Sequence, residues 1–328
     1  MKRFLSFVLS LVLLCTLSLS VVAESAEKPI VRLAAMTGPT AMGLVKLLDD
    51  GKNGLSANQY DFLLAGAADE ITPSLLQGKL DIASIPVNLA ANLNNKKPGA
   101  FTLLAVNTLG VIYIVEKGGE TVQTLADLKG KTIYATGRGS TPEYNLTYLL
   151  KQAGLTLGED VTVEWKSEPA EVVALMSQQE AAVAMLPQPF VTVAQNQVQG
   201  LRIALNLTQE WDALQLDSRM ITSGIVARTE FVNENPEAVE NFLKEFAASA
   251  QYANEFVPET AALIGELGIV KAPIAEKALP YCNIVCLTGA EMQEALAAYL
   301  QVLFELNPVS VGGTLPNDAF YYMNEESK

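Results

Sequence analysis

Hydrophobic residues in this chain form short unbroken runs that alternate with segments in which they recur every three or four positions. The runs at 30–36, 60–66 and 80–84 have the length of β-strands, and turn residues border each of them. Apolar residues at helical spacing follow two of these runs, at 42–48 and 69–78. The pattern predicts β-strands and α-helices in alternation over the first hundred residues.

The same order returns about a hundred residues later. Residues 131–150 predict strand, loop and helix, 160–165 predict a second strand, and 170–190 predict helix, strand and a proline turn. The two copies align without gaps, and the paired residues are Leu75 with Met176, Gln77 with Gln178, Ile82 with Val183, Ala83 with Ala184, Ile85 with Leu186, and Pro86 with Pro187. Two unrelated amphipathic stretches could match by chance, but the shared proline favours two α/β lobes of like construction.

Strands that alternate with helices predict an α/β fold with mostly parallel sheets, which bind ligands at the carboxyl ends of their strands. An apolar segment at 102–118, split at Asn107–Thr108, is long enough to cross from one lobe to the other. Residues 218–232 can cross back. We therefore expect lobe 1 to comprise residues 28–108 plus 219–328 and lobe 2 residues 109–218, with the two crossings as a hinge.

Two long amphipathic segments near the end of the chain, at 235–256 and 288–307, predict helices of the scaffold. Asn235 and Thr288 stand at their starts and are candidates for N-capping residues.

The first 23 residues have the features of a secretory signal. Met1-Lys2-Arg3 gives a basic start, an apolar stretch follows from Phe4 to Val22, and Ala23 provides a small residue for cleavage. An uncleaved membrane anchor is the alternative, and Cys15 leaves lipidation open, although bulky residues precede it. No later stretch has spanning length, so we expect an extracytoplasmic protein, in the periplasm or at the outer face of the membrane.

Charge and composition exclude several functions. The formal net charge is −14, and an acidic surface repels phosphate backbones, so we expect no nucleic-acid partner. The chain contains no histidine, which excludes histidine-dependent triads, histidine proton shuttles and the usual zinc sites. We expect no metal and no catalytic residue.

Cys282 and Cys286 stand four residues apart around an apolar "NIV" that reads as a strand. Residues at that separation on an extended strand are too distant to bridge, although an exported protein could oxidise them. We expect two free thiols, at least one of them buried, and their role stays open.

A glycine-rich loop, "YATGRGSTPEY" at 134–144, joins a predicted strand to a predicted helix. Such a loop suits an anion or a polar small molecule. It departs from nucleotide-binding motifs, because Gly139 stands where a P-loop needs lysine and Pro142 where the dinucleotide fingerprint needs a small residue. Its counterpart in the first copy is "AMTGPTAMG" at 35–43.

Four stretches in series give the chain a family resemblance: "LLQGKLDIASIPVN", "TLADLKGKTIYATGRGSTPEYNLTYLLKQAGL", "AAVAMLPQPFVTVA" and "FVNENPEAVENFLKEF". With them the sequence resembles the extracytoplasmic solute-binding proteins of ABC importers, in the group that binds nitrate, taurine, alkanesulfonates and thiamine-pyrimidine precursors (NMT1/SsuA-like). The resemblance implies a type II periplasmic-binding-protein fold, in which two lobes close on a solute and deliver it to a membrane permease.

Carried onto this sequence, the resemblance implies five cleft loops. The residues expected to contact the ligand are Thr37, Pro39, Thr40, Ala67, Asn88, Arg138, Ser140, Thr141, Gln188 and Phe190. The hydroxyls and Asn88 could serve equally as helix caps, and Arg138, the only cation in these loops, could be a solvated arginine. Arg219 is a second candidate cation. A stacking wall could come from Tyr113, Tyr144, Phe190 and Trp211, which could equally be core residues.

The resemblance therefore implies a monomeric protein without cofactor or chemistry that passes a small solute to an importer permease. A sensor that presents its ligand to a membrane receptor is the alternative. An enzyme like the thiamine-pyrimidine synthases is disfavoured, because those consume a histidine that this chain lacks. Whether the solute is a sulfonate, nitrate, a pyrimidine or another heterocycle stays open.

Overall fold

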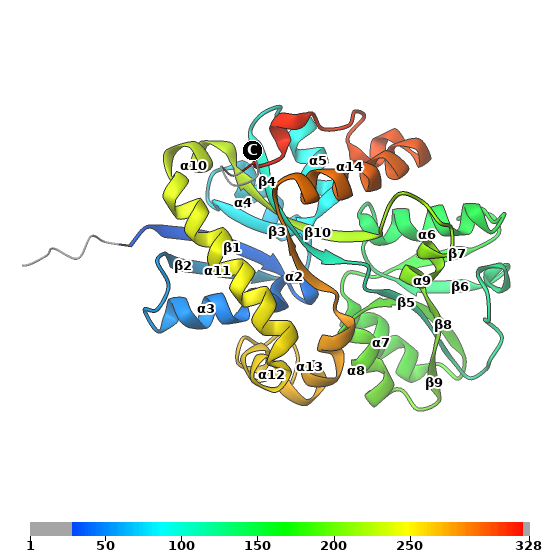
Figure 1. The fold of residues 1–328 in the computed structure, drawn as a ribbon. Helices are drawn as coiled ribbons and strands as arrows, with labels where there is room; N and C mark the ends of the chain where they lie inside the picture. The colour runs from blue at the N-terminus through cyan, green and yellow to red at the C-terminus, as the bar shows by residue number, and fades with distance from the viewer. Residues whose placement is uncertain (1–27, 324–328) are drawn as a thin grey trace, which may run out of the picture.

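The computed structural model describes residues 28–323, so the predicted signal at 1–23 lies outside the described residues. Two lobes lie side by side, each built around one β-sheet with helices packed on it (Figure 1). In Figure 1 the second lobe is the green one, and the first combines the blue and cyan start of the chain with its yellow-to-red end. The α/β class and the two-lobed arrangement predicted from the sequence are confirmed.

The first sheet has the strand order β11-β4-β10-β3-β1-β2. Its strands are β1 (Ile30–Met36), β2 (Gln59–Ala65), β3 (Ile82–Pro86), β4 (Phe101–Leu109), β10 (Ile221–Arg228) and β11 (Ile284–Leu287). The second sheet has the order β7-β6-β8-β5-β9. Its strands are β5 (Ile112–Lys117), β6 (Thr132–Ala135), β7 (Thr162–Trp165), β8 (Ala182–Pro187) and β9 (Leu201–Asn206).

The two sheets are built alike, as the internal repeat predicted. β1 lies between β2 and β3 and pairs with both in parallel, and β6 lies in the same way between β7 and β8. Ile82 pairs with Leu33 in the first sheet, and its sequence counterpart Val183 pairs with Ile133 in the second. The ungapped alignment of the two copies therefore matches residues in equivalent positions.

The strand pairing in both sheets is mixed, because the parallel pairs are confined to these three-strand units. β10 and β4 in the first sheet, and β5 and β9 in the second, pair antiparallel to their neighbours. A helical crossover returns the chain in the same direction, whereas β4 passes directly into β5 with only a two-residue break. The two strands that begin after a crossing, β5 and β10, therefore run opposite to the parallel three-strand unit of their sheet, whereas β4 and β9 run in its direction.

The first crossing breaks at Gly110–Val111 and not at Asn107–Thr108, which lie inside β4. Asn107 fits a buried strand because its side chain is fully engaged: Nδ2 donates to Ser84 Oγ at 2.8 Å, and Oδ1 accepts from Ser223 Oγ at 2.8 Å. A Cβ on Gly110 would lie 2.2 Å from Thr208 Oγ1. The first crossing therefore packs so closely against Thr208 that a side chain at Gly110 would require Thr208 to move.

Thirteen helices are described. They are α2 (Pro39–Met42), α3 (Val45–Lys52), α4 (Ala68–Leu76), α5 (Val87–Lys96), α6 (Thr141–Gln152), α7 (Pro169–Gln178), α8 (Phe190–Gln197), α9 (Leu207–Asp212), α10 (Thr229–Glu234), α11 (Pro236–Glu255), α12 (Val257–Glu266), α13 (Ala272–Ala278) and α14 (Gly289–Leu306). Short 3₁₀ turns are found at η1 (Leu125–Leu128), η2 (Leu279–Tyr281), η3 (Pro308–Val311) and η4 (Asp318–Phe320). Asn235 and Thr288 do stand at the N-caps of α11 and α14, although neither side chain makes a capping bond.

The C-terminal helix α14 adds a link between the lobes that the sequence did not suggest (Figure 1). It packs against β4 of the first lobe and against α6 of the second. The Tyr299 hydroxyl donates to Asn145 Oδ1 of α6 at 2.6 Å, and the Tyr299 ring lies 5.6 Å from that of Trp211 in α9. The lobes are thus joined by this packing as well as by the two chain crossings.

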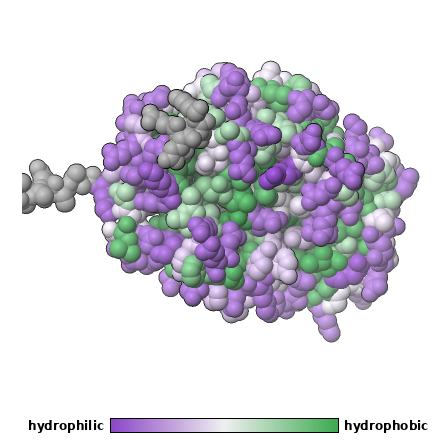
Figure 2. Space-filling model, in the orientation of Figure 1, coloured by the Kyte–Doolittle hydropathy of each residue, from purple (hydrophilic) through white to green (hydrophobic). Residues whose placement is uncertain are grey.

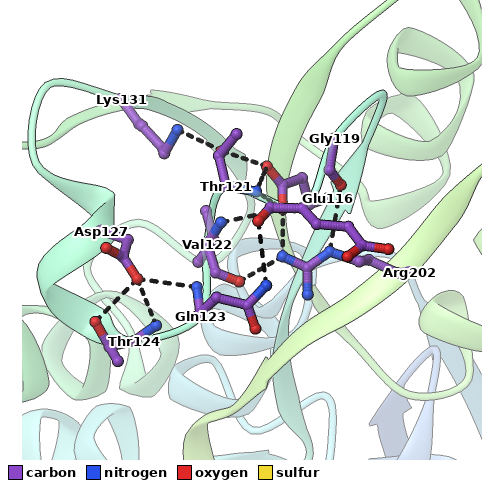
Figure 3. A network of polar contacts seen from close by, with 10 residues as sticks. Glu116, Gly119, Thr121, Val122, Gln123, Thr124, Asp127, Lys131 and Arg202 are labelled. Carbon is purple, nitrogen blue, oxygen red and sulfur yellow. Dashed lines mark hydrogen bonds and ion pairs between the residues drawn. The ribbon is translucent and has the colours of Figure 1, made fainter.

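A buried carboxylate fixes the loop after β5 (Figure 3). Glu116 accepts hydrogen bonds from the backbone N–H groups of Thr121 and Val122 and forms an ion pair with Arg202 of β9. Burial by itself would raise the pKa of the Glu116 carboxyl, but the bonds from Thr121, Val122 and Arg202 together hold its pKa below the usual value. This network stabilises the edge of the second sheet at β9.

Both cysteines of the described part are free thiols, as predicted, with Cys282 buried and Cys286 half-buried. Cys286 lies in β11 and Cys282 in the turn before it.

Within residues 28–323 no helix is long and apolar enough to cross a membrane. On the face shown in Figure 2, hydrophilic residues dominate the outline and hydrophobic ones gather in patches toward the centre.

Candidate functional site

A cavity of about 500 Å³ lies between the two lobes. The carboxyl ends of β1, β2 and β3 meet it from one side, and those of β6, β7 and β8 from the other. The helices α2, α4, α6 and α7 begin at its wall. Both parallel three-strand units therefore open onto one space, which is where sheets of this kind bind ligands.

Seven of the ten predicted contact residues line this cavity: Thr37, Pro39, Thr40, Ala67, Arg138, Ser140 and Thr141. The other three lie beside it. Gln188 is buried and accepts a hydrogen bond from Thr192 Oγ1 at 3.0 Å, and Phe190 belongs to the hydrophobic core of the second lobe. Asn88 is buried where the lobes meet, and its side chain donates to backbone carbonyls.

The predicted hydroxyl groups use their protons inside the protein. Thr37 Oγ1 donates to Ala65 O at 3.1 Å, Ser140 Oγ to Gly137 O at 2.8 Å, and Thr141 Oγ1 to Thr222 O at 3.1 Å. Thr40 Oγ1 donates to Met36 O. In this arrangement their oxygens can accept from a ligand but cannot donate to it.

Three further hydroxyls in the wall have no hydrogen-bond partner among residues 28–323, namely those of Thr72, Thr136 and Ser167. These groups are free to donate to a ligand. They were missed because they lie outside the five loops to which the family resemblance assigns the cleft.

Glutamate and proline residues reduce the number of backbone donors at the helix N-termini of the cavity. Glu70, Glu143 and Glu171 stand at the third position of α4, α6 and α7, and each accepts from a backbone N–H just before its helix. Proline also occupies the first or second position of α2, α6 and α7 and removes an N–H there. The backbone N–H groups of Ala68 and Asp69, at the start of α4, have no partner among the described residues and remain as donors at the wall.

Positive charge at the cavity comes from more than Arg138. Lys166 and Lys96 also line the wall, whereas Asp69 contributes one carboxylate and Arg219 lies outside it. Arg138 is exposed and has no ion-pair or hydrogen-bond partner in the described part of the chain, while Lys166 lies 3.5 Å from Glu164. Arg138 is therefore available to an anion.

The repeat could have identified Lys166. Gly66 and Ala67 follow the second strand of the first copy, and Lys166 and Ser167 follow the second strand of the second copy. Equivalent strands end at the same edge of equivalent sheets, so the loop after either strand should meet the ligand.

Much of the wall is aliphatic. Met36, Leu76, Leu89, Leu93, Val111, Ile112 and Met185 line the cavity, and no aromatic residue of the described chain does. Of the proposed stacking residues, Trp211 is fully buried between Tyr148 and Tyr299, at ring distances of 5.0 and 5.6 Å. Tyr113 and Phe190 are core residues, and Tyr144 packs against the core.

The lobes touch one another around the cavity. Asn88 Nδ2 lies 3.3 Å from Gly139 O, and a Cβ on Gly38 would lie 3.9 Å from Gln188 O. A Cβ on Gly66 would lie 2.9 Å from Glu168 Oε1 and 3.2 Å from Glu70 Oε1, so carboxylates of both lobes meet above this glycine. We call this arrangement, in which the two lobes are in contact around the cavity, the closed arrangement.

This architecture is similar to that of the type II periplasmic binding proteins, and solved structures share the fold. An ABC transporter protein from Parabacteroides distasonis superposes with a TM-score of 0.74 at 23% identity, over 90% of this chain and 99% of that one. The ligand-binding component of an ABC-type import system from Staphylococcus aureus gives a TM-score of 0.71 at 15% identity, over 90% and 97% of the two chains. The periplasmic aliphatic sulphonate binding protein SsuA from Escherichia coli gives 0.68 at 18% identity, over 86% and 94%.

Sequence comparison gives one family match. Residues 99–261, just under half of the chain, are similar to the family described as NMT1/THI5 like, and this similarity confirms the resemblance stated from the motifs. A protein of Brucella abortus described as a binding protein is 29% identical over 147 residues. That match spans 44% of this chain and only 43% of the relative.

Proposed function

We propose that this protein captures a small organic solute between its lobes, outside the cytoplasm, and delivers it to the permease of an ABC importer. The supporting observation is the cavity of about 500 Å³, enclosed by the carboxyl ends of both parallel units and by the starts of four helices. Its size lies within the range of pockets that enclose a small organic molecule. We take the lobes to be residues 28–108 with 219–328, and 109–218, and the working state to be a monomer.

The lining favours an amphipathic solute. An aliphatic wall without aromatic side chains suits an aliphatic body, because such a body gains free energy from the apolar area it buries and has no ring to stack. Arg138 and Lys166 suit an anionic head, and the hydroxyls of Thr72, Thr136 and Ser167 can donate to it. A bare inorganic anion such as nitrate would leave most of this space unfilled.

The test is a thermal-shift screen of the purified protein. The panel holds alkanesulfonates and alkanecarboxylates of increasing chain length, with nitrate, pyrimidines, other heterocycles and amino acids as comparison classes. A ligand present at a hundred times its dissociation constant stabilises the folded state by about 2.7 kcal/mol. We expect the shift to grow with chain length among the aliphatic anions and nitrate to have little effect. If no compound of this panel raises the melting temperature, the proposal is wrong.

Arg138→Ala tests the anionic head. Because Arg138 is exposed and unpaired in the described part of the chain, its loss should leave the melting temperature of the ligand-free protein within about 1 °C and weaken an anionic ligand about tenfold or more. Arg219→Ala is the matched control, since Arg219 is also exposed and without a partner among residues 28–323 but lies outside the cavity wall. Equal affinities of the two variants in calorimetric titration would remove Arg138 from the site.

A further inference from the structure

Three asparagines on one face of α5 hold the C-terminal segment of the chain. Asn88, Asn92 and Asn95 are spaced four and three residues apart, so their side chains project from the same side of the helix. Asn92 Nδ2 donates to Ser310 O at 2.8 Å, and Asn95 Nδ2 donates to Val311 O and Thr314 O, each at 2.6 Å. The segment is thereby fixed to the first lobe.

Asn88 differs from the other two because it also reaches the second lobe. Its Nδ2 donates to Ser310 O at 3.1 Å and to Gly139 O at 3.3 Å. Gly139 stands between Arg138 and Ser140, which both line the cavity. A single buried amide group thus joins the C-terminal segment of the first lobe to the ligand-facing loop of the second.

The surroundings of Asn88 allow its bond to Gly139 to break without leaving the Nδ2 donor unpaired. The side chain is fully buried, and its Oδ1 has no hydrogen-bond partner among the described residues. When the lobes separate, Nδ2 keeps its bond to Ser310 O, so opening removes the bond to Gly139 without stranding the donor. Ser310 O in turn keeps its bond from Asn92.

We propose that Asn88 is a positioning residue that latches the loop of residues 137–140 in the closed arrangement. It acts without touching the solute: it holds Arg138 and Ser140 at the cavity wall by binding the carbonyl between them. The inference rests on the proposed function, since a latch between lobes serves a protein that closes on a solute. It assigns to Asn88 the retention of the closed state in place of a direct ligand contact.

The experiment compares Asn88→Ala with Asn95→Ala. Both substitutions remove an amide that binds the C-terminal segment from the same face of α5, but only the first removes a bond between lobes. Fluorophores placed at Lys52→Cys and Glu159→Cys, two exposed positions on different lobes, report the lobe separation by single-molecule energy transfer.

The native thiols should not compete for the label. Burial raises the pKa of the Cys286 thiol to about 12 and raises that of Cys282 as well, so neither forms the reactive thiolate near neutral pH. Cys15→Ser removes the remaining cysteine.

In ligand-free protein we expect a closed population that Asn88→Ala lowers about two- to tenfold relative to the open one, as the loss of one hydrogen bond between neutral groups implies. Asn95→Ala should leave that ratio unchanged while lowering the melting temperature. The inference is overturned if the wild type shows no closed population, if Asn88→Ala behaves as the wild type, or if both variants shift the ratio equally. Because no ligand is used, such a failure leaves the thermal-shift test of the proposed function intact.

Discussion

The buried hydrogen bond between Tyr299 and Asn145 allows a sharp test of the link that α14 makes between the lobes. Tyr299→Phe removes one hydroxyl group and leaves the ring in place, so little packing is lost. Both residues are buried, and Asn145 Nδ2 already lacks a partner among residues 28–323. Without the Tyr299 hydroxyl, Asn145 Oδ1 loses its donor too, and the whole amide is left buried and unpaired.

An unpaired buried polar group costs about 1–3 kcal/mol, so we expect Tyr299→Phe to lower the free energy of unfolding by about 2 kcal/mol. With a urea slope of about 3 kcal/mol per molar, the unfolding midpoint should fall by about 0.7 M while the slope stays constant. Tyr148→Phe is the control, because Tyr148 also packs on Trp211 but its hydroxyl has no hydrogen-bond partner within residues 28–323. That variant should change the free energy of unfolding by less than about 0.5 kcal/mol.

The double variant Tyr299→Phe/Asn145→Leu separates the two explanations for any loss. If the loss of stability comes from the unpaired amide of Asn145, replacing that amide with an apolar side chain of similar shape should recover at least half of the stability lost by Tyr299→Phe. If the double variant is instead as unstable as the sum of the two single variants, the amide is not the cause. A wild-type midpoint for Tyr299→Phe would refute the reasoning altogether.

Two further predictions concern the second lobe. The pKa of Glu116 is lower in the folded protein than its ordinary value of 4.5, so the stability that Glu116 provides is present above that value and is lost as the pH falls through its folded-state pKa. Glu116→Gln should therefore cost about 2 kcal/mol at pH 7, and urea titrations from pH 7 to pH 3 should show a smaller acid-induced loss in the variant than in the wild type. Gly118 has a φ of 78°, and its Cβ would lie 2.4 Å from Glu180 O, so Gly118→Ala should cost at least about 2 kcal/mol in the same assay. Gly130→Ala, at a φ of 76° with open space around it, should cost about 1 kcal/mol, and equal costs would show that the contact with Glu180 does not matter.

The sequence alone determined the order of the elements and their repetition, because these follow from local patterns. Strand-length apolar runs and helical spacing are properties of neighbouring residues, and the shared proline after Ile85 and Leu186 is enough to mark equivalent strands. The family resemblance assigned the cleft to loops at the ends of those strands, and seven of the ten residues predicted from it lie in the cavity wall.

Only the tertiary structure decided which groups in those loops are free to meet a ligand. Ser140 and Thr141 look available in the sequence, yet their protons are taken by carbonyls of Gly137 and Thr222, the second of which is 81 residues away. The aliphatic wall, the absence of aromatic residues from it in the described chain, and the position of Lys166 depend on how separate elements pack. Asn88 contacts both Ser310 and Gly139 and so joins three distant parts of the chain. No local pattern predicts these contacts, because they exist only once the lobes have folded against each other.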